Sequence, residues 1–253
     1  MRVLPVLALL SILPAPASAL DGGTPASTDD PRAAATVAIQ VVEPLNDGTH
    51  RSHECSGALI APDLVLTAGH CLDKAARPEH IAVFFFDGPR AVAPYAKVAA
   101  FTAHPAHEKG WADEPGDIQT RQTQVASDIA VLRLAAPVRG RRPVSFDAAA
   151  RTMSFIALAA GSDRAGKSGT LRRTALGKLY RTQTGTPLVF ASPEGAVCSG
   201  DSGGPVFTAN GGLWGILGAI TRAENGCSAR AVIVPVDAAH PAFAGMILVA
   251  RGR

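Results

Sequence analysis

The sequence has little of what marks several large protein classes. Its 253 residues carry a net charge of only +3, with 24 lysines and arginines against 21 aspartates and glutamates, so nothing indicates a nucleic-acid or anionic-membrane partner. The apolar runs at Val3–Leu13 and Ala242–Ala250 are too short to span a bilayer, and the second predicts a strand or a terminal helix. We find no internal repeat and no helical periodicity. At 47% hydrophobic and 18% charged residues, the chain can still bury a sizeable core.

The first residues have the composition of an export signal. Met1-Arg2 gives a basic start, the apolar run follows, and Pro14 and Ala17-Ser18-Ala19 supply a site of the A-x-A type. A membrane anchor is disfavoured because the run is short. We therefore expect residues 1–19 to be a signal peptide, residues 20–253 to be one mature domain, and the product to be secreted or periplasmic, with no membrane contact after signal removal.

Cysteine is scarce, and its spacing argues for disulfides. The chain contains Cys55, Cys71, Cys198 and Cys227, which allow three pairings, and it has no Cys-x-x-Cys pair of the kind found in zinc sites. Export favours oxidation. We expect Cys55 to pair with Cys71 and Cys198 to pair with Cys227, which would brace two motifs described below.

Short β-rich segments separated by glycine, proline and aspartate predict an all-β barrel or sandwich. The residues at 104–124 are polar and predict a surface loop, in which Asp113, Glu114 and Asp117 could bind calcium but more simply form a solvated acidic loop. The expected strands are Ala35–Val42, Ser56–Ile60, Leu64–Thr67, Ile81–Phe86, Lys97–Ala103, Ile129–Leu134, Ser154–Ala159, Thr186–Phe190, Pro205–Thr208, Trp214–Ile220 and Val232–Val236.

Against this background, Gly200-Asp201-Ser202-Gly203-Gly204-Pro205 has the composition of a nucleophile loop. A serine hydroxyl is a weak nucleophile until a base takes its proton and donors wait for the oxyanion. Glycine neighbours allow a sharp turn and close approach of a carbonyl group. The amides of Gly200 and Ser202 are the expected oxyanion donors.

Two further strings supply the base and its partner. Leu66-Thr67-Ala68-Gly69-His70-Cys71 places an imidazole at the end of an apolar strand, and its ordinary pKa suits general-base work at neutral pH. Asp128 opens the apolar run Ile129-Ala130-Val131-Leu132, where a buried carboxylate needs a partner such as an imidazole N–H. We expect His53, His104 and His107 to be surface residues.

The three strings resemble those of the chymotrypsin/trypsin-like serine proteases, from Leu20 to about Val236. The serine string matches that family without change, whereas Gly69 replaces an alanine of its usual Thr-Ala-Ala-His-Cys. The resemblance implies two six-stranded antiparallel β-barrels with the active site between them, and a His70, Asp128 and Ser202 triad that hydrolyses peptide bonds. It also implies a peptide or protein substrate and a reaction that needs no cofactor or metal. We expect the protein to be a monomer.

The same resemblance extends to the start of the mature chain. Leu20-Asp21-Gly22-Gly23 is similar to the family's apolar-x-Gly-Gly start, whose new amino group pairs with the aspartate before the nucleophile, here Asp201. Cleavage after Ala19 would create the Leu20 amine directly, so we expect no separate activation peptide. A buried ammonium paired with this carboxylate would order the oxyanion loop.

Substrate preference is also inferred from the resemblance. The family position at the base of the primary pocket, six residues before the nucleophile, is Ala196, which lacks the aspartate that trypsin-like enzymes use to bind lysine or arginine. Ile220 and Ala231 are the expected pocket walls, where Ile220 would narrow the pocket. We therefore predict a preference for small or medium apolar P1 residues, although the strand Gly215–Ile220 lacks the family's serine and tryptophan.

Two other interpretations compete with this one. Gly200-x-Ser202-x-Gly204 fits the nucleophile elbow of α/β-hydrolases, but that fold needs an acid and then a histidine after the serine, and only Asp237 and His240 are offered. A catalytically weak homologue that acts as a binding protein is the alternative function, because a fold does not fix an activity.

Overall fold

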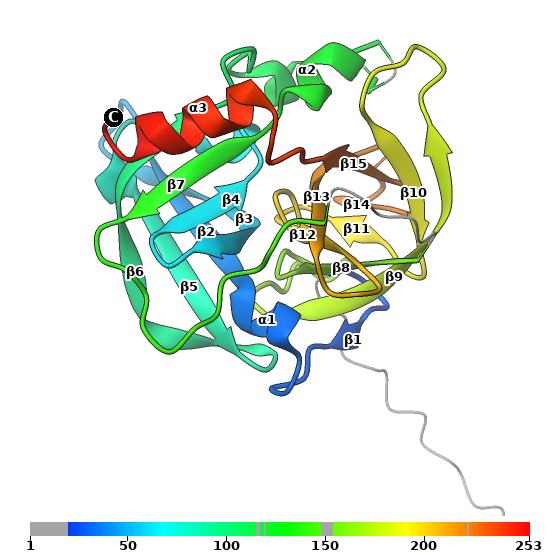
Figure 1. Ribbon diagram of the computed structural model, residues 1–253, viewed down its shortest axis with the longest axis horizontal. Helices are drawn as coiled ribbons and strands as arrows, with labels where there is room; N and C mark the ends of the chain where they lie inside the picture. Colours follow the sequence, from blue (N-terminus) through cyan, green and yellow to red (C-terminus); the bar gives the residue numbers. More distant parts are fainter. Residues whose placement is uncertain (1–19, 115–116, 119, 148–153, 222) are drawn as a thin grey trace, which may run out of the picture.

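Two closed antiparallel β-barrels lie side by side in the computed structural model, which describes residues 20–114, 117–118, 120–147, 154–221 and 223–253 (Figure 1). The expected signal peptide at 1–19 lies outside these residues. Strands of the first barrel bury alternate side chains, as the pattern of β2 shows, and its hydrogen-bonded order is β2-β3-β4-β7-β6-β5. These strands are β2 (Thr36–Pro44), β3 (His50–Ala61), β4 (Leu64–Thr67), β5 (Ile81–Asp87), β6 (Arg90–Ala103) and β7 (Ala130–Leu134).

The second barrel has the order β9-β10-β15-β13-β12-β8 and closes through pairing of β8 with β9. Its core contains Phe155, Val206, Leu217 and Ile233, and Leu20 is fully buried among them. The strands are β8 (Phe155–Ala159), β9 (Arg172–Arg181), β10 (Val189–Pro193), β12 (Pro205–Thr208), β13 (Leu213–Ile220) and β15 (Ala231–Pro235).

Shorter elements brace the barrels. Strand β1 (Thr24–Pro25) pairs with β9, and β11 (Val197–Cys198) pairs with β14 (Cys227–Ser228). Helix α3 (Pro241–Ala250) packs on the first barrel, where Arg133 Nε donates to the Ala250 carbonyl at 2.7 Å (Figure 1). The remaining elements are α1 (Pro31–Ala35), α2 (Gln122–Ala126), η1 (His70–Leu72), η2 (Pro78–His80) and η3 (Trp111–Asp113).

The predicted fold class is confirmed, because each expected strand range overlaps an observed strand and the barrels are antiparallel throughout. This excludes the α/β-hydrolase interpretation, which needs a mainly parallel sheet covered by helices. The segment at 242–250 is a helix, and across the described ranges no helix is both long and apolar enough to cross a bilayer. Strand β9 was not predicted, because Arg172, Arg173 and Lys178 interrupt its apolar alternation.

Candidate active site

His70 lies at the end of the first barrel, in the turn η1 that follows β4, and Asp128 lies just before β7, which pairs with β4. The two side chains meet because neighbouring strands deliver them to the same edge. Asp128 is fully buried; its Oδ2 bonds His70 Nδ1 at 2.7 Å, and its Oδ1 accepts the His70 backbone N–H at 2.7 Å. A carboxylate only accepts, so the proton of this hydrogen bond lies on Nδ1, and the neutral ring can accept a proton at Nε2.

The environment of His70 favours its protonated form. Burial of the ring would lower its pKa, but the charge of Asp128 and its hydrogen bond outweigh this, with smaller contributions from Asp73 and Asp113. The pKa of His70 is therefore raised above its ordinary 6.5. Trp111 packs edge-on against the imidazole, with ring centroids 5.9 Å apart.

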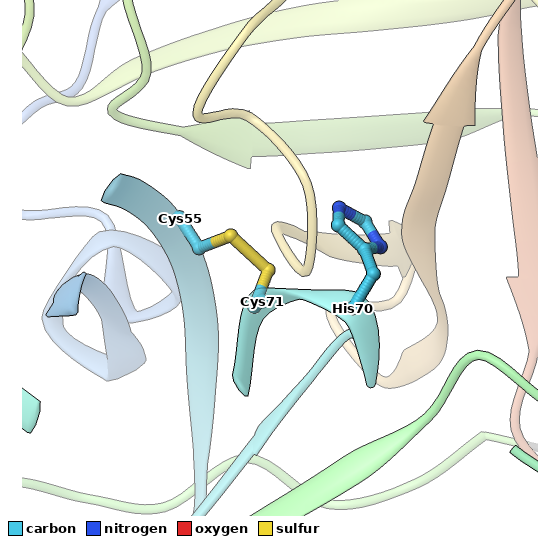
Figure 2. Close-up of side chains that lie close together, drawn as sticks. All are labelled: Cys55, His70 and Cys71. Carbon is cyan, nitrogen blue, oxygen red and sulfur yellow. A yellow bond between two sulfur atoms is a disulfide. The ribbon is translucent and has the colours of Figure 1, made fainter. Parts of the chain in front are cut away.

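A disulfide braces the histidine turn. Cys71 follows His70 and is bonded to Cys55 on β3, as predicted (Figure 2). Ligand atoms of Cys55, His70 and Cys71 lie within 4.8 Å of one another, a spacing that a metal site also has. Because both sulfurs are consumed in the disulfide, neither can be a thiolate ligand, and the cluster does not fit a zinc ion.

Ser202 sits in a tight loop held from both sides. The Asp201 amide donates to the Cys198 carbonyl at 3.1 Å, and the Gly203 amide donates to Leu217 of β13 at 2.6 Å. The second predicted disulfide, Cys198–Cys227, ties the start of this loop to β14. Gly200 has φ +89°, and a Cβ there would stand 2.8 Å from the Cα of Gly161, so only glycine fits.

Ser56 links the two barrels at this loop, a role that the sequence did not reveal. It lies on β3 with no exposed surface, and its amide donates to the Ser202 carbonyl at 2.8 Å. Its hydroxyl donates to the Gly200 carbonyl at 3.1 Å and accepts from the Ala160 amide at 3.0 Å. One side chain from the first barrel therefore fixes the loop that carries the expected nucleophile and oxyanion donors. The signal that the sequence did offer was the position of Ser56 next to Cys55, a cysteine expected to be bonded beside the histidine motif.

Asp201 is buried beneath the same loop, with Leu20 beside it. Its Oδ2 accepts the Leu20 backbone N–H at 3.3 Å and the Cys198 amide at 2.8 Å, while its Oδ1 accepts the Gly161 amide at 3.0 Å. Burial raises the pKa of Asp201 to about 7, although these three hydrogen bonds act in the opposite direction. A positive charge at Leu20 would relieve this buried anion.

A cleft of about 690 Å³ is lined by residues of both barrels, and both His70 and Ser202 are among them. Of the expected pocket residues, Ile220 lines the cleft, whereas Ala196 and Ala231 are buried, and Ala231 pairs with Ile220 across β13 and β15. Arg230, next to Ala231, is exposed and lines the cleft, which sequence reasoning missed.

One of the three histidines expected at the surface is not there. The His107 side chain is only 4% exposed and lies between Asp73 and Asp128, so that prediction was wrong. Its burial follows from its place after β6, where its amide donates to the His104 carbonyl and turns the chain under the histidine motif. His53 is partly exposed on the cleft wall and bonds Glu43 at 2.8 Å.

The acidic residues of the loop at 104–124 have partners within the protein. Asp113 pairs with Lys74 at 2.6 Å, Glu114 with Arg121 at 3.2 Å, and Asp117 accepts the Thr120 amide at 3.0 Å. These carboxylates diverge toward separate partners. The arrangement favours the solvated loop over a calcium site.

Comparison with known proteins identifies the family to which this sequence belongs. The Trypsin family profile matches residues 27–242. Among similar solved structures, the scabies mite inactivated protease paralogue S-D1 is 15% identical with a TM-score of 0.65, over 85% of this chain and 91% of that one. HL collagenase is 16% identical with a TM-score of 0.65, over 91% and 98% of the two chains. At such identities these structures show a shared fold, whereas the family match spans most of the sequence: the chain belongs to the trypsin family.

Proposed function

We propose that the protein is a serine endopeptidase in which Ser202 is the nucleophile, His70 the general base and Asp128 the residue that orients His70. The observation that carries the proposal is the pair of hydrogen bonds that Asp128 accepts from His70, one from the backbone N–H and one from the ring, beside the cleft that Ser202 lines. That arrangement fixes the tautomer whose Nε2 accepts the serine proton.

The chain supplies a chemical group for each step of the proposed reaction. The Ser202 hydroxyl attacks the scissile carbonyl while His70 Nε2 takes its proton, and the amides of Gly200 and Ser202 stabilise the oxyanion. His70 then gives the proton to the leaving amine, and the peptide bond breaks to form an acyl-enzyme. Water then gives a proton to the same imidazole and attacks the ester, and the imidazole returns that proton to the Ser202 oxygen as the acyl group leaves.

Secretion and maturation are part of the proposal. Removal of residues 1–19 would give Leu20 a free amine, and the Leu20 nitrogen already lies 3.3 Å from Asp201. An ammonium there would pair with the buried carboxylate and hold the oxyanion loop. The two disulfides suit an exported, oxidising environment, secreted or periplasmic.

The primary pocket is proposed to take small or medium apolar side chains. Ile220, a large apolar residue, lines the cleft, and the buried Ala196 and Ala231 supply no negative charge that would bind lysine or arginine. Ile220→Gly should widen the preference toward larger apolar residues. A peptide library cleaved by both proteins and read by mass spectrometry measures this; an unchanged profile would remove Ile220 from the pocket.

Cleavage itself is tested on the same library with Ser202→Ala as the matched control. We expect hydrolysis by the wild-type protein and loss by several orders of magnitude in the variant, which deletes only a hydroxyl. Tight peptide binding without cleavage by folded wild-type protein would support the binding-protein alternative instead.

A further inference from the structure

The buried His107 ring lies against the carboxylate that orients His70. Its Nδ1 is 3.7 Å from Asp128 Oδ1, the oxygen that accepts the His70 backbone N–H. Among the described residues this nitrogen has no hydrogen-bond partner. An unpartnered buried imidazole atom beside a buried carboxylate calls for an explanation.

Asp73 anchors the other edge of the ring. His107 Nε2 is 2.9 Å from Asp73 Oδ1, and because a carboxylate only accepts, that nitrogen carries a proton. Asp73 Oδ2 accepts the Gly110 amide at 2.8 Å, directly before Trp111, whose ring packs against His70. Burial would raise the pKa of Asp73, but the hydrogen bonds from His107 and Gly110 outweigh it, so the pKa is lowered and the group stays ionised.

The ring also explains the departure of the histidine string from its family. Gly69 has φ −64° and ψ −47°, an ordinary helical conformation that any residue adopts. A Cβ at Gly69 would lie 2.6 Å from Nδ1 and 2.7 Å from Cε1 of His107. Glycine is therefore needed here for space, and the space is filled by this imidazole.

We propose that His107, anchored by Asp73, is a positioning residue that fixes the Asp128 carboxylate and, through it, the His70 ring. The titratable groups around the ring are Asp73, Asp128, His70 and His104, so it stands between two carboxylates. Gly69 and His107 depend on each other, because the imidazole occupies the space that a side-chain methyl group at position 69 would need. The inference rests on the proposed protease function.

The test compares His107→Ala with the double variant Gly69→Ala/His107→Ala, which refills the space with a methyl group and restores the family's string. Both should lose kcat by about 10–100-fold with little change in KM, since a small displacement of catalytic groups has effects of this size. In both, the low-field proton resonance of the His70 Nδ1–H bond should shift or broaden. His50→Ala, at an exposed histidine that does not line the cleft, is the control and should change neither kcat nor the resonance.

Recovery of wild-type kcat and resonance in the double variant would show that the ring only fills space, and would overturn the inference. The resonance is measurable without turnover, so an inactive wild-type protein would sink the proposed function while leaving this test readable. Thermal unfolding comes first. If neither variant folds, His107→Gln, which keeps an N–H donor for Asp73, replaces them with the same expected loss of kcat.

Discussion

Asp128 and Asp201 are both fully buried aspartates within the candidate site, yet their surroundings give them different tasks. Asp128, on the first barrel, accepts a hydrogen bond from the ring N–H of His70 and raises the pKa of that histidine. Asp201, on the second barrel, has backbone N–H groups as its sole hydrogen-bond donors among the described residues, and burial raises its own pKa to about 7. The comparison teaches that the partner decides the effect: one carboxylate raises the pKa of an imidazole, whereas the other, facing backbone amides, has its own pKa raised.

The largest effect is expected at the first carboxylate. Asp128→Asn keeps the shape but replaces an acceptor by an amide, so His70 takes the wrong tautomer and kcat should fall by about 10⁴. Steady-state kinetics on a cleaved peptide measure the loss. A fall of less than tenfold, in folded protein, would mean that Asp128 does not orient the base.

A smaller loss is expected at the second carboxylate. Asp201→Asn leaves one acceptor oxygen for the amides of Gly161, Cys198 and Leu20, so the oxyanion loop should be displaced and kcat should fall by about 10². Asp29→Asn, at an exposed aspartate, is the matched control. Equal kcat values for the two variants would mean that Asp201 does not contribute to catalysis.

A shift in the pH profile comes next. Because the base must be neutral and the pKa of His70 is raised, the acid limb of kcat/KM should have its midpoint above 6.5. In Asp128→Asn the residual activity should show a lower midpoint, since the charge that raises the pKa is gone. A midpoint that stays in place in the variant would mean that the Asp128 charge does not raise the pKa of His70.

The smallest effect concerns stability. When Leu20 is still joined to the preceding residue, it brings no charge to Asp201, and the pKa of Asp201 is about 7 in the folded protein. The ordinary pKa of this group is 3.8. Between these two pH values the folded protein therefore holds a proton that the unfolded chain releases. Stability of that form should therefore fall as pH rises from about 4 to 7. A protein beginning at Leu20 should lose less, because its ammonium offsets the buried charge.

Unfolding midpoints of the two forms, recorded across this range of pH, make the comparison. Parallel curves would argue that the Leu20 amine does not pair with Asp201.

The barrel strands other than β9, both disulfides and the proximity of His70 to Asp128 were predictable, because local strings place each residue at a strand end or in a loop of known type. His107 was not, since a lone polar histidine in a loop carries no sign of the carboxylates that the fold brings to it. Ser56 was missed for a related reason: its hydroxyl acts on Gly200 of the other barrel. Such contacts depend on how the barrels meet, which strand periodicity does not encode.

The central claim is that Ser202 is an activated nucleophile. Reaction of the folded protein with a fluorophosphonate, followed by peptide mapping, tests it most directly, with His70→Ala and Ser202→Ala as controls. We predict one covalent adduct on Ser202 that is strongly slowed in His70→Ala and absent from Ser202→Ala. Folded wild-type protein that stays unlabelled, or carries the label elsewhere, would contradict the claim.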